Sequence, residues 1–282
     1  MDGIILINKE PNMTSRDVVN KVCHLLNTKK VGHTGTLDPM ATGVLVLAVN
    51  KGLKVVSELT ALDKEYEAEI TLGIETDTLD VTGNTISTQE VNVTNEDIDR
   101  VLNSFIGDYS MEVPIYSAIK VNGKKLYEYA RNNEEVEIPV HKVKVYDLKR
   151  TSDIKDNKFS IKCKVSKGTY IRSLVRDISK ELGTVGVMSK LNRTKQGNFD
   201  IKDCYTLNDI EQGNYKLLDI KEVLNLPIVE VPDNIYKRII NGNKIENIFE
   251  YDKFIFEKDN KLIAIYEVDS KSGLLKPLHM FI

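Results

Sequence analysis

The sequence predicts an α+β fold with a second, smaller β domain at its C-terminal end. Segments in which apolar and polar residues alternate outnumber segments with helical periodicity, and the two kinds are not regularly interleaved. A doubly wound α/β sheet is therefore disfavoured. The composition also shifts near Pro227 and Pro232, and the tail that follows is rich in β-branched and aromatic residues. We expect one large domain over residues 1–225 and a small β domain over residues 226–282.

The first fifty residues predict a strand, a helix, a loop and a second strand. Residues 4–7 are an apolar run that is typical of a buried strand. Thr14 precedes a segment whose apolar residues recur on one helical face, so we expect it to cap a helix. Residues 31–43 are rich in Gly and Thr and contain a proline, which indicates a loop. An apolar strand is expected directly after it, at 44–49.

The middle of the chain predicts two further strands and a capped helix. Apolar residues alternate with polar ones over 65–72 and again over 159–165, as they do in half-buried strands. Thr94 and Asp97 have the spacing of a capping box. We expect Gly107 to end the helix that these two residues begin.

The last third of the chain predicts one long helix and two tight turns. A helix is expected to follow residues 168–172 and to end at Gly183. In the tail, Asn-Gly at 241–242 and Asp-Asn at 259–260 predict hairpin turns.

The composition excludes several classes of protein. No apolar run is long enough to span a bilayer, and we see no signal peptide. Cys23, Cys163 and Cys204 are too far apart for a metal knuckle, and the four histidines lack the spacing of metal ligands. We therefore expect a cytoplasmic protein without a metal or a cofactor. We also expect it to be a monomer. The net charge of −3 leaves nucleic-acid binding open, because one basic face is enough for it.

The loop around Asp38 is the first candidate for chemistry. Gly32 and Gly35 are expected to allow positive φ angles and close approach to a ligand, and Pro39 fixes the chain just after the carboxylate. Asp38 would then lie on a stiff loop beside a buried strand, which suits a reacting group. The alternative is that Asp38 caps a turn, as Asp before Pro often does. The loop lacks the Walker pattern, so a nucleotide-binding loop is disfavoured.

A second candidate is the segment 168–172. Tyr170 and Arg172 are two residues apart, so on an extended chain their side chains point to the same side. An arginine beside a buried carboxylate keeps it ionised and binds both of its oxygens. The alternative is an ordinary ion pair at the start of a helix. His33 is a further candidate because the first loop places it near Asp38.

The segment 114–146 is rich in basic residues with tyrosines between them. Its cations include Lys120, Lys124 and Arg131. Such a mixture can bind a phosphate backbone and stack on bases. The alternative is a solvated helix with two edge strands, and composition alone favours that alternative.

Six motifs follow one another along roughly the first 200 residues. They are GHTGTLDPMATG at 32–43, KEYEA at 64–68, TDTLD at 76–80, YSAIKVNGKKLYEYAR at 116–131, SKGTYIRSL at 166–174 and LNRT at 191–194. In order and spacing, this set resembles the bacterial TruB family of tRNA pseudouridine synthases, which isomerise uridine 55 in the T loop of tRNA. The C-terminal tail resembles the reduced PUA-like domain of such enzymes more weakly.

The resemblance assigns roles to individual residues. Asp38 matches the catalytic aspartate, and Arg172 matches the arginine that pairs with it. Tyr66 matches the tyrosine that stacks on the target base and accepts the proton from C5. The residues that match contacts to the flipped-out nucleotide, or that fill the space it leaves, are His33, Tyr170 and Leu191.

The resemblance also implies an architecture and a partner. It implies a pseudouridine synthase fold, in which helices and loops flank a central mixed, mainly antiparallel sheet. The insertion at about 114–146, with Lys120, Lys124 and Arg131, would grip the T stem-loop of tRNA, and no cofactor would be needed. The alternative is a tRNA-binding folding chaperone on the same scaffold, alone or together with catalysis. A glycoside hydrolase is disfavoured because it normally needs two facing acids.

One motif departs from the family. The usual Lys-Pro-x-Gly is replaced by Lys9-Glu10-Pro11-Asn12. Asparagine tolerates the left-handed conformation better than most residues do, so we expect Asn12 to take the place of the glycine.

Overall fold

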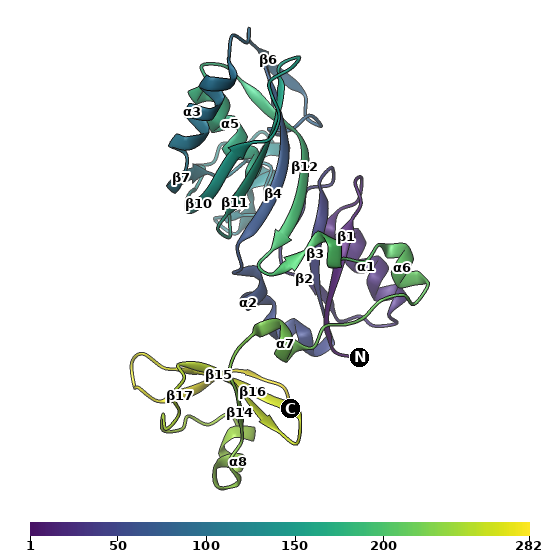
Figure 1. The fold of residues 1–282 in the computed structure, drawn as a ribbon, viewed down its shortest axis with the longest axis vertical. Helices are drawn as coiled ribbons and strands as arrows, with labels where there is room; N and C mark the ends of the chain where they lie inside the picture. The colour runs from purple at the N-terminus through teal and green to yellow at the C-terminus, as the bar shows by residue number, and fades with distance from the viewer.

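The computed structural model describes all 282 residues, which form two bodies of unequal size (Figure 1). The larger body is built on a nine-stranded sheet with β2 and β13 attached to its main path. The order along that path is β1 (Gly3–Lys9), β3 (Thr42–Val49), β12 (Gly186–Gln196), β4 (Lys64–Leu72), β11 (Lys158–Val165), β10 (Val140–Arg150) and β7 (Gly107–Glu112). The two attached strands are β2 (Val31–His33), which pairs with β3, and β13 (Phe199–Asp200), which pairs with β12.

The sheet is mixed but mainly antiparallel, as predicted. Within it only β3 and β12 pair in parallel, through Thr42 with Asn192 and Gly43 with Arg193. This pairing connects the N-terminal strands to the rest of the sheet. It also places the beginning of β3, directly after the loop that contains Asp38, beside the end of β12.

The helices that flank the sheet begin where the sequence predicts them. α1 (Ser15–Leu25) starts at a capping box of Thr14 and Asp17. α3 (Asn95–Ser104) starts at the predicted capping box of Thr94 and Asp97. The prediction that Gly107 ends α3 is wrong. The helix ends at Ser104, and Gly107, with φ +116°, begins β7.

Helix α5 connects the catalytic candidates to the core. It spans Ile171–Glu181, with Tyr170 as its N-cap residue, and packs against β12, β4 and β7. Gly183 follows it with φ +77°, and its N–H donates to the carbonyl of Lys180, as expected for a glycine after a helix. The short helices of this body are α2 (Val56–Thr60), α4 (Leu126–Arg131), α6 (Leu207–Glu211) and α7 (Ile220–Leu224), with 3₁₀ turns η1 (Asn50–Val55) and η2 (Ile201–Asp203). None of the helices is long and apolar enough to cross a bilayer.

Two small hairpins extend from the large sheet. One is β5 (Ile74–Thr76) with β6 (Thr85–Thr88), and the other is β8 (Lys120–Val121) with β9 (Lys124–Lys125), which leads directly into α4. The second hairpin belongs to the segment 113–139, which leaves the sheet where Glu112 pairs with Val140. The last residues of the predicted insertion, 140–146, lie in β10 itself.

The smaller body has its own four-stranded sheet and one helix. Its elements are β14 (Ile228–Glu230), α8 (Asp233–Ile240), β15 (Lys253–Lys258), β16 (Lys261–Val268) and β17 (Leu275–Met280), and the strand order is β14-β15-β16-β17. Asp259 and Asn260 both have positive φ between β15 and β16, which confirms that hairpin. The hairpin predicted at 241–242 is wrong, because Asn241 and Gly242 terminate α8 instead.

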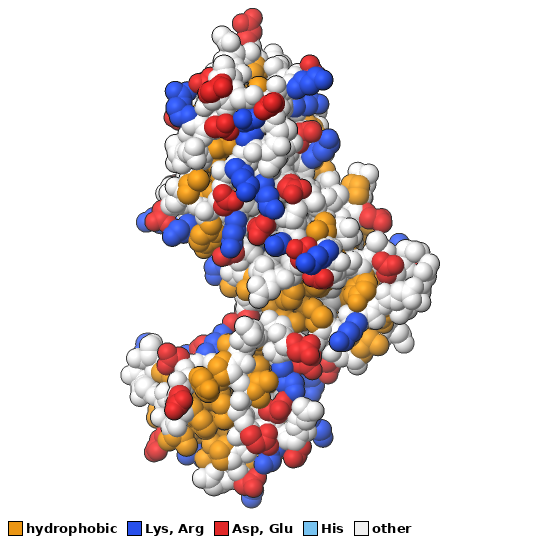
Figure 2. All heavy atoms as spheres, in the orientation of Figure 1, with side chains coloured by type: hydrophobic (Ala, Val, Ile, Leu, Met, Phe, Trp, Pro, Cys, Tyr) orange, Lys and Arg blue, Asp and Glu red, His pale blue; other side chains and the backbone are white.

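The two bodies share part of their apolar core. One buried cluster joins Ile4, Leu6 and Val44 of the large sheet to Ile265 and Phe281 of the smaller body. Ion pairs across the same contact include Lys253 with Glu58 of α2. Figure 2 shows the two bodies meeting at a waist, with apolar side chains gathered on the visible face of the smaller one.

The glycines of the first loop do not have the backbone conformations that the sequence predicted. Neither Gly32 nor Gly35 has a positive φ, and Gly43, with φ +101°, is the glycine of this segment in that conformation. A Cβ on Gly32 would lie 2.8 Å from the side chain of Leu53, so close packing explains that glycine. Asn12 does have a positive φ of 64°, as expected from the departure in the motif.

Candidate active site

Asp38 lies on a loop that has no strand or helix of its own between β2 and β3. Contacts from outside hold this loop in place. The buried Lys9 donates from Nζ to the carbonyl of Pro39 at 3.1 Å. Ser15 at the start of α1 accepts from the N–H of Leu37 at 2.9 Å and donates to its carbonyl at 3.2 Å. The expected stiffness therefore comes from neighbouring side chains as much as from the proline.

Arg172 of α5 binds both oxygens of the Asp38 carboxylate. Its Nη2 lies 3.1 Å from Oδ1, and its Nε lies 3.0 Å from Oδ2. The guanidinium is itself fixed, because it donates to the carbonyls of Thr78 at 2.9 Å and Tyr116 at 3.1 Å. Only 6 % of Arg172 is exposed, so the pair is a preorganised, charge-assisted contact and not a solvated surface ion pair.

Two opposing effects act on the pKa of Asp38. Burial raises this pKa above its ordinary value and is the largest effect, while the Arg172 guanidinium lowers it. Asp80 also raises it, and its carboxylate lies 4.0 Å from the same guanidinium. The side chain of Asp38 retains 29 % of its exposure, so the carboxylate can still be reached from solvent. Arg172 thus counteracts the effect of burial on the pKa of this carboxylate.

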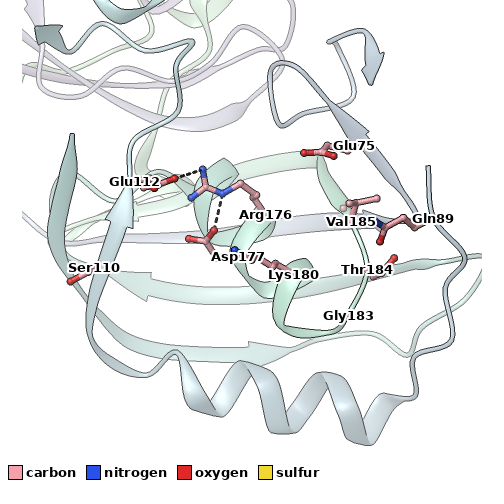
Figure 3. Close-up of a pocket in the computed structure, with 11 residues that line it drawn as sticks. Glu75, Gln89, Ser110, Glu112, Arg176, Asp177, Lys180, Gly183, Thr184 and Val185 are labelled. Atoms are coloured by element: carbon pink, nitrogen blue, oxygen red, sulfur yellow. Dashed lines mark hydrogen bonds and ion pairs between the residues drawn. The ribbon is translucent and has the colours of Figure 1, made fainter. Parts of the chain in front are cut away.

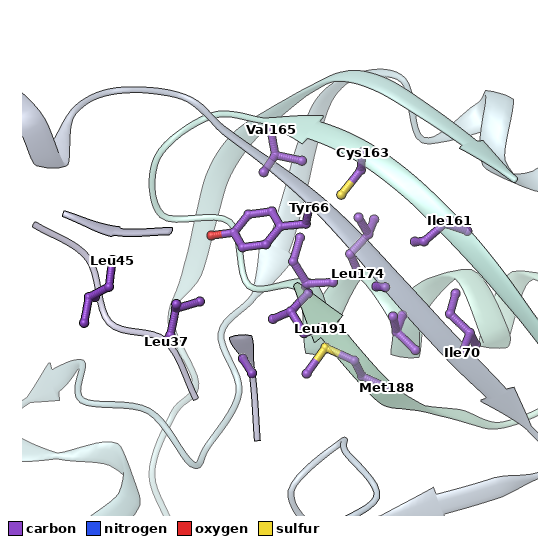
Figure 4. Packing of buried hydrophobic residues seen from close by; sticks show 14 of the residues in the cluster. Leu37, Leu45, Tyr66, Ile70, Ile161, Cys163, Val165, Leu174, Met188 and Leu191 are labelled. Atoms are coloured by element: carbon purple, nitrogen blue, oxygen red, sulfur yellow. The ribbon is translucent and has the colours of Figure 1, made fainter. Parts of the chain in front are cut away.

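Tyr66 of β4 lies at the edge of the core next to this loop. Its ring is buried, with 7 % of the residue exposed, and belongs to the same apolar cluster as Leu37 and Leu191. Figure 4 shows the ring beside Leu191, with its hydroxyl end directed toward Leu37, the residue before Asp38. Leu191 is brought there by its pairing with Ala68, two residues after Tyr66.

Tyr170 and His33 flank the same loop from different elements. Burial raises the pKa of the Tyr170 phenol, and Arg172 and Asp38 are close enough to perturb that pKa too. Burial lowers the pKa of His33, whose Nδ1 is buried without a hydrogen-bond partner. A neutral imidazole with a free buried nitrogen is available to a ligand that brings a donor or an acceptor.

The basic residues predicted in the insertion lie on the second small hairpin and on α4. Lys120 is exposed. Lys124 pairs with Glu134, and its ammonium lies 4.6 Å from the centre of the Tyr129 ring. The guanidinium of Arg131 lies 5.2 Å from the centre of the Tyr127 ring. The basic and aromatic side chains of this segment therefore contact one another. The segment also reaches the site through the carbonyl of Tyr116.

Three residues that support the site were not singled out by the sequence patterns. Lys9 and Arg193 are buried cations that bind carbonyls of the Asp38 loop, and Asp80 approaches Arg172. A signal for Arg193 existed, because it is two residues after Leu191 on a strand and should therefore face the same side. Lys9 lies in the motif at 9–12 and Asp80 in the motif at 76–80, but the sequence patterns gave neither residue a role of its own.

A polar cavity of about 660 Å³ lies further along α5 (Figure 3). Its wall includes Arg176, which pairs with Asp177 at 2.7 Å and with Glu112 at 3.6 Å. None of the predicted site residues lines it. No group of three or more His, Cys, Asp or Glu side chains is placed to hold a metal ion.

Comparisons with known proteins identify the family. Residues 23–171 match the model of the TruB family pseudouridylate synthase N-terminal domain, and residues 172–225 match that of the tRNA pseudouridylate synthase B C-terminal domain. The chain is 42 % identical to tRNA pseudouridine synthase B of Oceanobacillus iheyensis, over 100 % of this chain and 98 % of that protein. It is 40 % identical to the protein of that name from Bacillus subtilis, over 98 % of this chain and 96 % of the relative.

A solved structure shares the fold. A chain in the crystal structure of a Cbf5-Nop10-Gar1 complex superposes with a TM-score of 0.70 at 26 % identity, covering 94 % of this chain and 78 % of that one. Motifs, architecture and full-length similarity agree, and this chain belongs to the TruB family of tRNA pseudouridylate synthases.

Proposed function

We propose that this chain isomerises uridine 55 in the T loop of tRNA to pseudouridine, with Asp38 as the catalytic carboxylate. The observation that carries the proposal is the bidentate pair between the partly exposed Asp38, on a loop held from outside, and the buried Arg172 of α5. Such a pair keeps a carboxylate ionised in a partly dehydrated site. A protein that only binds RNA has no need of this arrangement, so it favours catalysis over a chaperone role alone.

The reaction breaks the C1′–N1 bond of the nucleotide and forms a C1′–C5 bond to the same base. The proton on C5 is lost, and N1 gains one, so no redox partner is required. Asp38 has to attack the base or the ribose, or remove a ribose proton to form a glycal, and an ionised carboxylate serves each route. Tyr66 stacks on the base and accepts the C5 proton.

The target base must leave its stack before it can reach Asp38. Extrusion costs a few kcal/mol, and stacking on an aromatic ring returns roughly 1–3 kcal/mol. In our proposal the ring of Tyr66 supplies this stacking, while His33, Tyr170 and Leu191 contact the base or fill its place. The insertion, with Lys120, Lys124 and Arg131, and the small C-terminal body bind the rest of the tRNA. We propose that the chain acts as a monomer.

The test is incubation with unmodified tRNA and mapping of pseudouridine. We expect modification at position 55 by the wild-type chain. Asp38→Asn should bind the same tRNA with nearly unchanged affinity and form no product. Turnover by Asp38→Asn near the wild-type rate would refute the role of the carboxylate. Tight binding without product from the wild-type chain would favour the chaperone.

A further inference from the structure

Arg193 of β12 is a buried cation whose hydrogen bonds all go to backbone carbonyls. Only 1 % of the residue is exposed. Its Nε donates to the carbonyl of Val44 at 2.6 Å, and its Nη2 donates to the carbonyl of Gly35 at 3.1 Å. It forms no ion pair with a carboxylate, unlike Arg172. Burying a charge costs free energy unless hydrogen bonds compensate for it. The groups that Arg193 binds therefore indicate its role.

The two carbonyls lie at the two ends of the Asp38 loop. Gly35 is three residues before Asp38, and Val44 is six residues after it, inside β3. One rigid guanidinium therefore spans the loop at its base. The planar fork of arginine suits this task, because its donors point in fixed and different directions. A lysine at the same place has all its donors on one nitrogen, so it lacks the two separate nitrogens with which Arg193 reaches the two carbonyls.

The sheet register gives Arg193 a second connection to the site. In β12 it is paired with Gly43 of β3 on one side and with Tyr66 of β4 on the other. The same residue thus fixes the loop that carries the carboxylate relative to the strand that carries the tyrosine. Gly43 allows the close approach of β3 to β12 at this point, because a Cβ on Gly43 would lie 2.3 Å from the backbone carbonyl oxygen of Arg193.

A neighbouring residue secures the start of the same segment. Gln196, which is fully buried, donates from Nε2 to Oγ1 of Thr34 at 2.6 Å and to the carbonyl of Leu59 at 2.9 Å. The end of β12 therefore binds the loop segment at residues 34, 35 and 44. Arg193 and Gln196 are both buried, so water competes little for their hydrogen bonds.

We propose that Arg193 is a positioning residue, which clamps both ends of the catalytic loop and so sets the place of Asp38 against Tyr66. This inference rests on the proposed catalytic role of Asp38. Arg193 acts through geometry and not through charge. The largest effects on the pKa of Asp38 come from burial, Arg172, Asp80 and Lys9. Arg193 binds backbone carbonyls at the two ends of the loop and not the carboxylate. Its removal should therefore lower the rate without changing the pH at which Asp38 ionises.

The experiment measures single-turnover rates against pH, with enzyme in saturating excess over tRNA, for Arg193→Met and Arg193→Lys. A displaced reacting group costs up to about 100-fold in rate for a shift near 1 Å. We expect Arg193→Met to lower the plateau rate roughly 10- to 100-fold and Arg193→Lys to recover part of that loss. The acid limb should stay at its wild-type pH, and the Kd for tRNA should change less than about threefold.

Lys64 offers a matched control. It is also a largely buried cation that binds two carbonyls, those of Thr60 at 2.7 Å and Leu62 at 2.5 Å, but neither belongs to the Asp38 loop. We expect Lys64→Met to lower thermal stability and to keep the plateau rate within about threefold of wild type, because the two carbonyls that it binds lie outside the Asp38 loop. An equal loss of rate in this control and in Arg193→Met would reduce Arg193 to a stabilising residue.

Other outcomes separate this inference from the proposed function. If Asp38→Asn is inactive but both Arg193 variants keep the wild-type plateau, the inference fails and the proposed function stands. If Asp38→Asn turns over normally, the proposed function itself fails. A shifted acid limb in Arg193→Met that returns to the wild-type pH in Arg193→Lys would show that the charge of Arg193 tunes Asp38 and would overturn the geometric role. If Arg193→Met does not fold, Arg193→Lys decides the question, because it keeps the charge but cannot bind both carbonyls as Arg193 does. A plateau rate below wild type then supports the proposal, and a wild-type plateau rate contradicts it.

Discussion

Removing the Arg172 guanidinium should raise the pH at which the enzyme becomes active. In the wild-type chain, burial raises the pKa of Asp38 and Arg172 pulls it back. Arg172→Ala deletes the effect that favours the charged form, so the pKa of Asp38 rises further. Because only ionised Asp38 is active in each route, the acid limb of the pH–rate profile moves upward. The difference in rate between the variant and the wild-type chain that comes from this shift disappears well above the raised pKa of Asp38 and is largest below it.

The size of this shift follows from the geometry. Two opposite charges about 4 Å apart interact by about 4 kcal/mol at an effective dielectric constant near 20, which is about three pKa units. Asp38 retains 29 % of its side-chain exposure, so water screens part of this interaction. A carboxylate beside an arginine typically has its pKa lowered by about 1–3 units. We therefore expect a shift of roughly one to two units.

The assay is single-turnover pseudouridine formation at a series of pH values, with tRNA binding measured in parallel. Arg172→Lys keeps the charge but loses the fork that binds both oxygens, so it should lower the plateau rate and leave the acid limb nearly in place. Asp80→Asn is the opposite perturbation, because Asp80 raises the pKa of Asp38. It should move the limb downward. Identical acid limbs in wild type and Arg172→Ala would show that Arg172 does not tune Asp38.

Two further predictions concern the base and the backbone of the RNA. Tyr66→Phe keeps the ring and loses the hydroxyl, so it should retain tRNA binding and lose roughly 10²- to 10⁴-fold in single-turnover rate, and an unchanged rate would exclude proton transfer by the hydroxyl. Changing Lys120, Lys124 and Arg131 to Ala should flatten the log–log dependence of Kd on salt by about one unit for each phosphate that the variant no longer binds. Lys149→Ala, at an exposed site on β10, is the control for this slope, and equal slopes in both variants would place the three cations in solvent.

Local features of the fold were predictable from sequence because their causes are local. The capping boxes at Thr14 and Thr94 depend on residues three apart, and both helices start where this spacing predicts. The turn at 259–260 likewise depends on two adjacent residues that accept positive φ. The turn predicted at 241–242 failed because the same residue types also follow helices, and the sequence there does not show that α8 precedes it.

The Asp38–Arg172 pair was predictable only through family resemblance. Its residues are 134 positions apart, and the parallel pairing of β3 with β12 helps to assemble the site. Neither the composition nor the periodicity of the sequence predicts that β3 pairs with β12. Gly32 and Gly35 show a related limit, since the pattern identifies a glycine but not whether it serves conformation or close packing.

Buried cations are the part of the site that sequence patterns describe least well. Lys9 and Arg193 are charged, so composition places them in solvent, yet both are buried and donate to carbonyls of the Asp38 loop. A loop without its own hydrogen-bond ladder has unpaired carbonyls, and buried donors must satisfy them. Cations on carbonyls hold the backbone without binding the carboxylate. Arg172 is thus the cation that binds the Asp38 carboxylate directly, while Arg193 binds the backbone at the two ends of the loop and Lys9 both binds the loop backbone and lowers the pKa of Asp38.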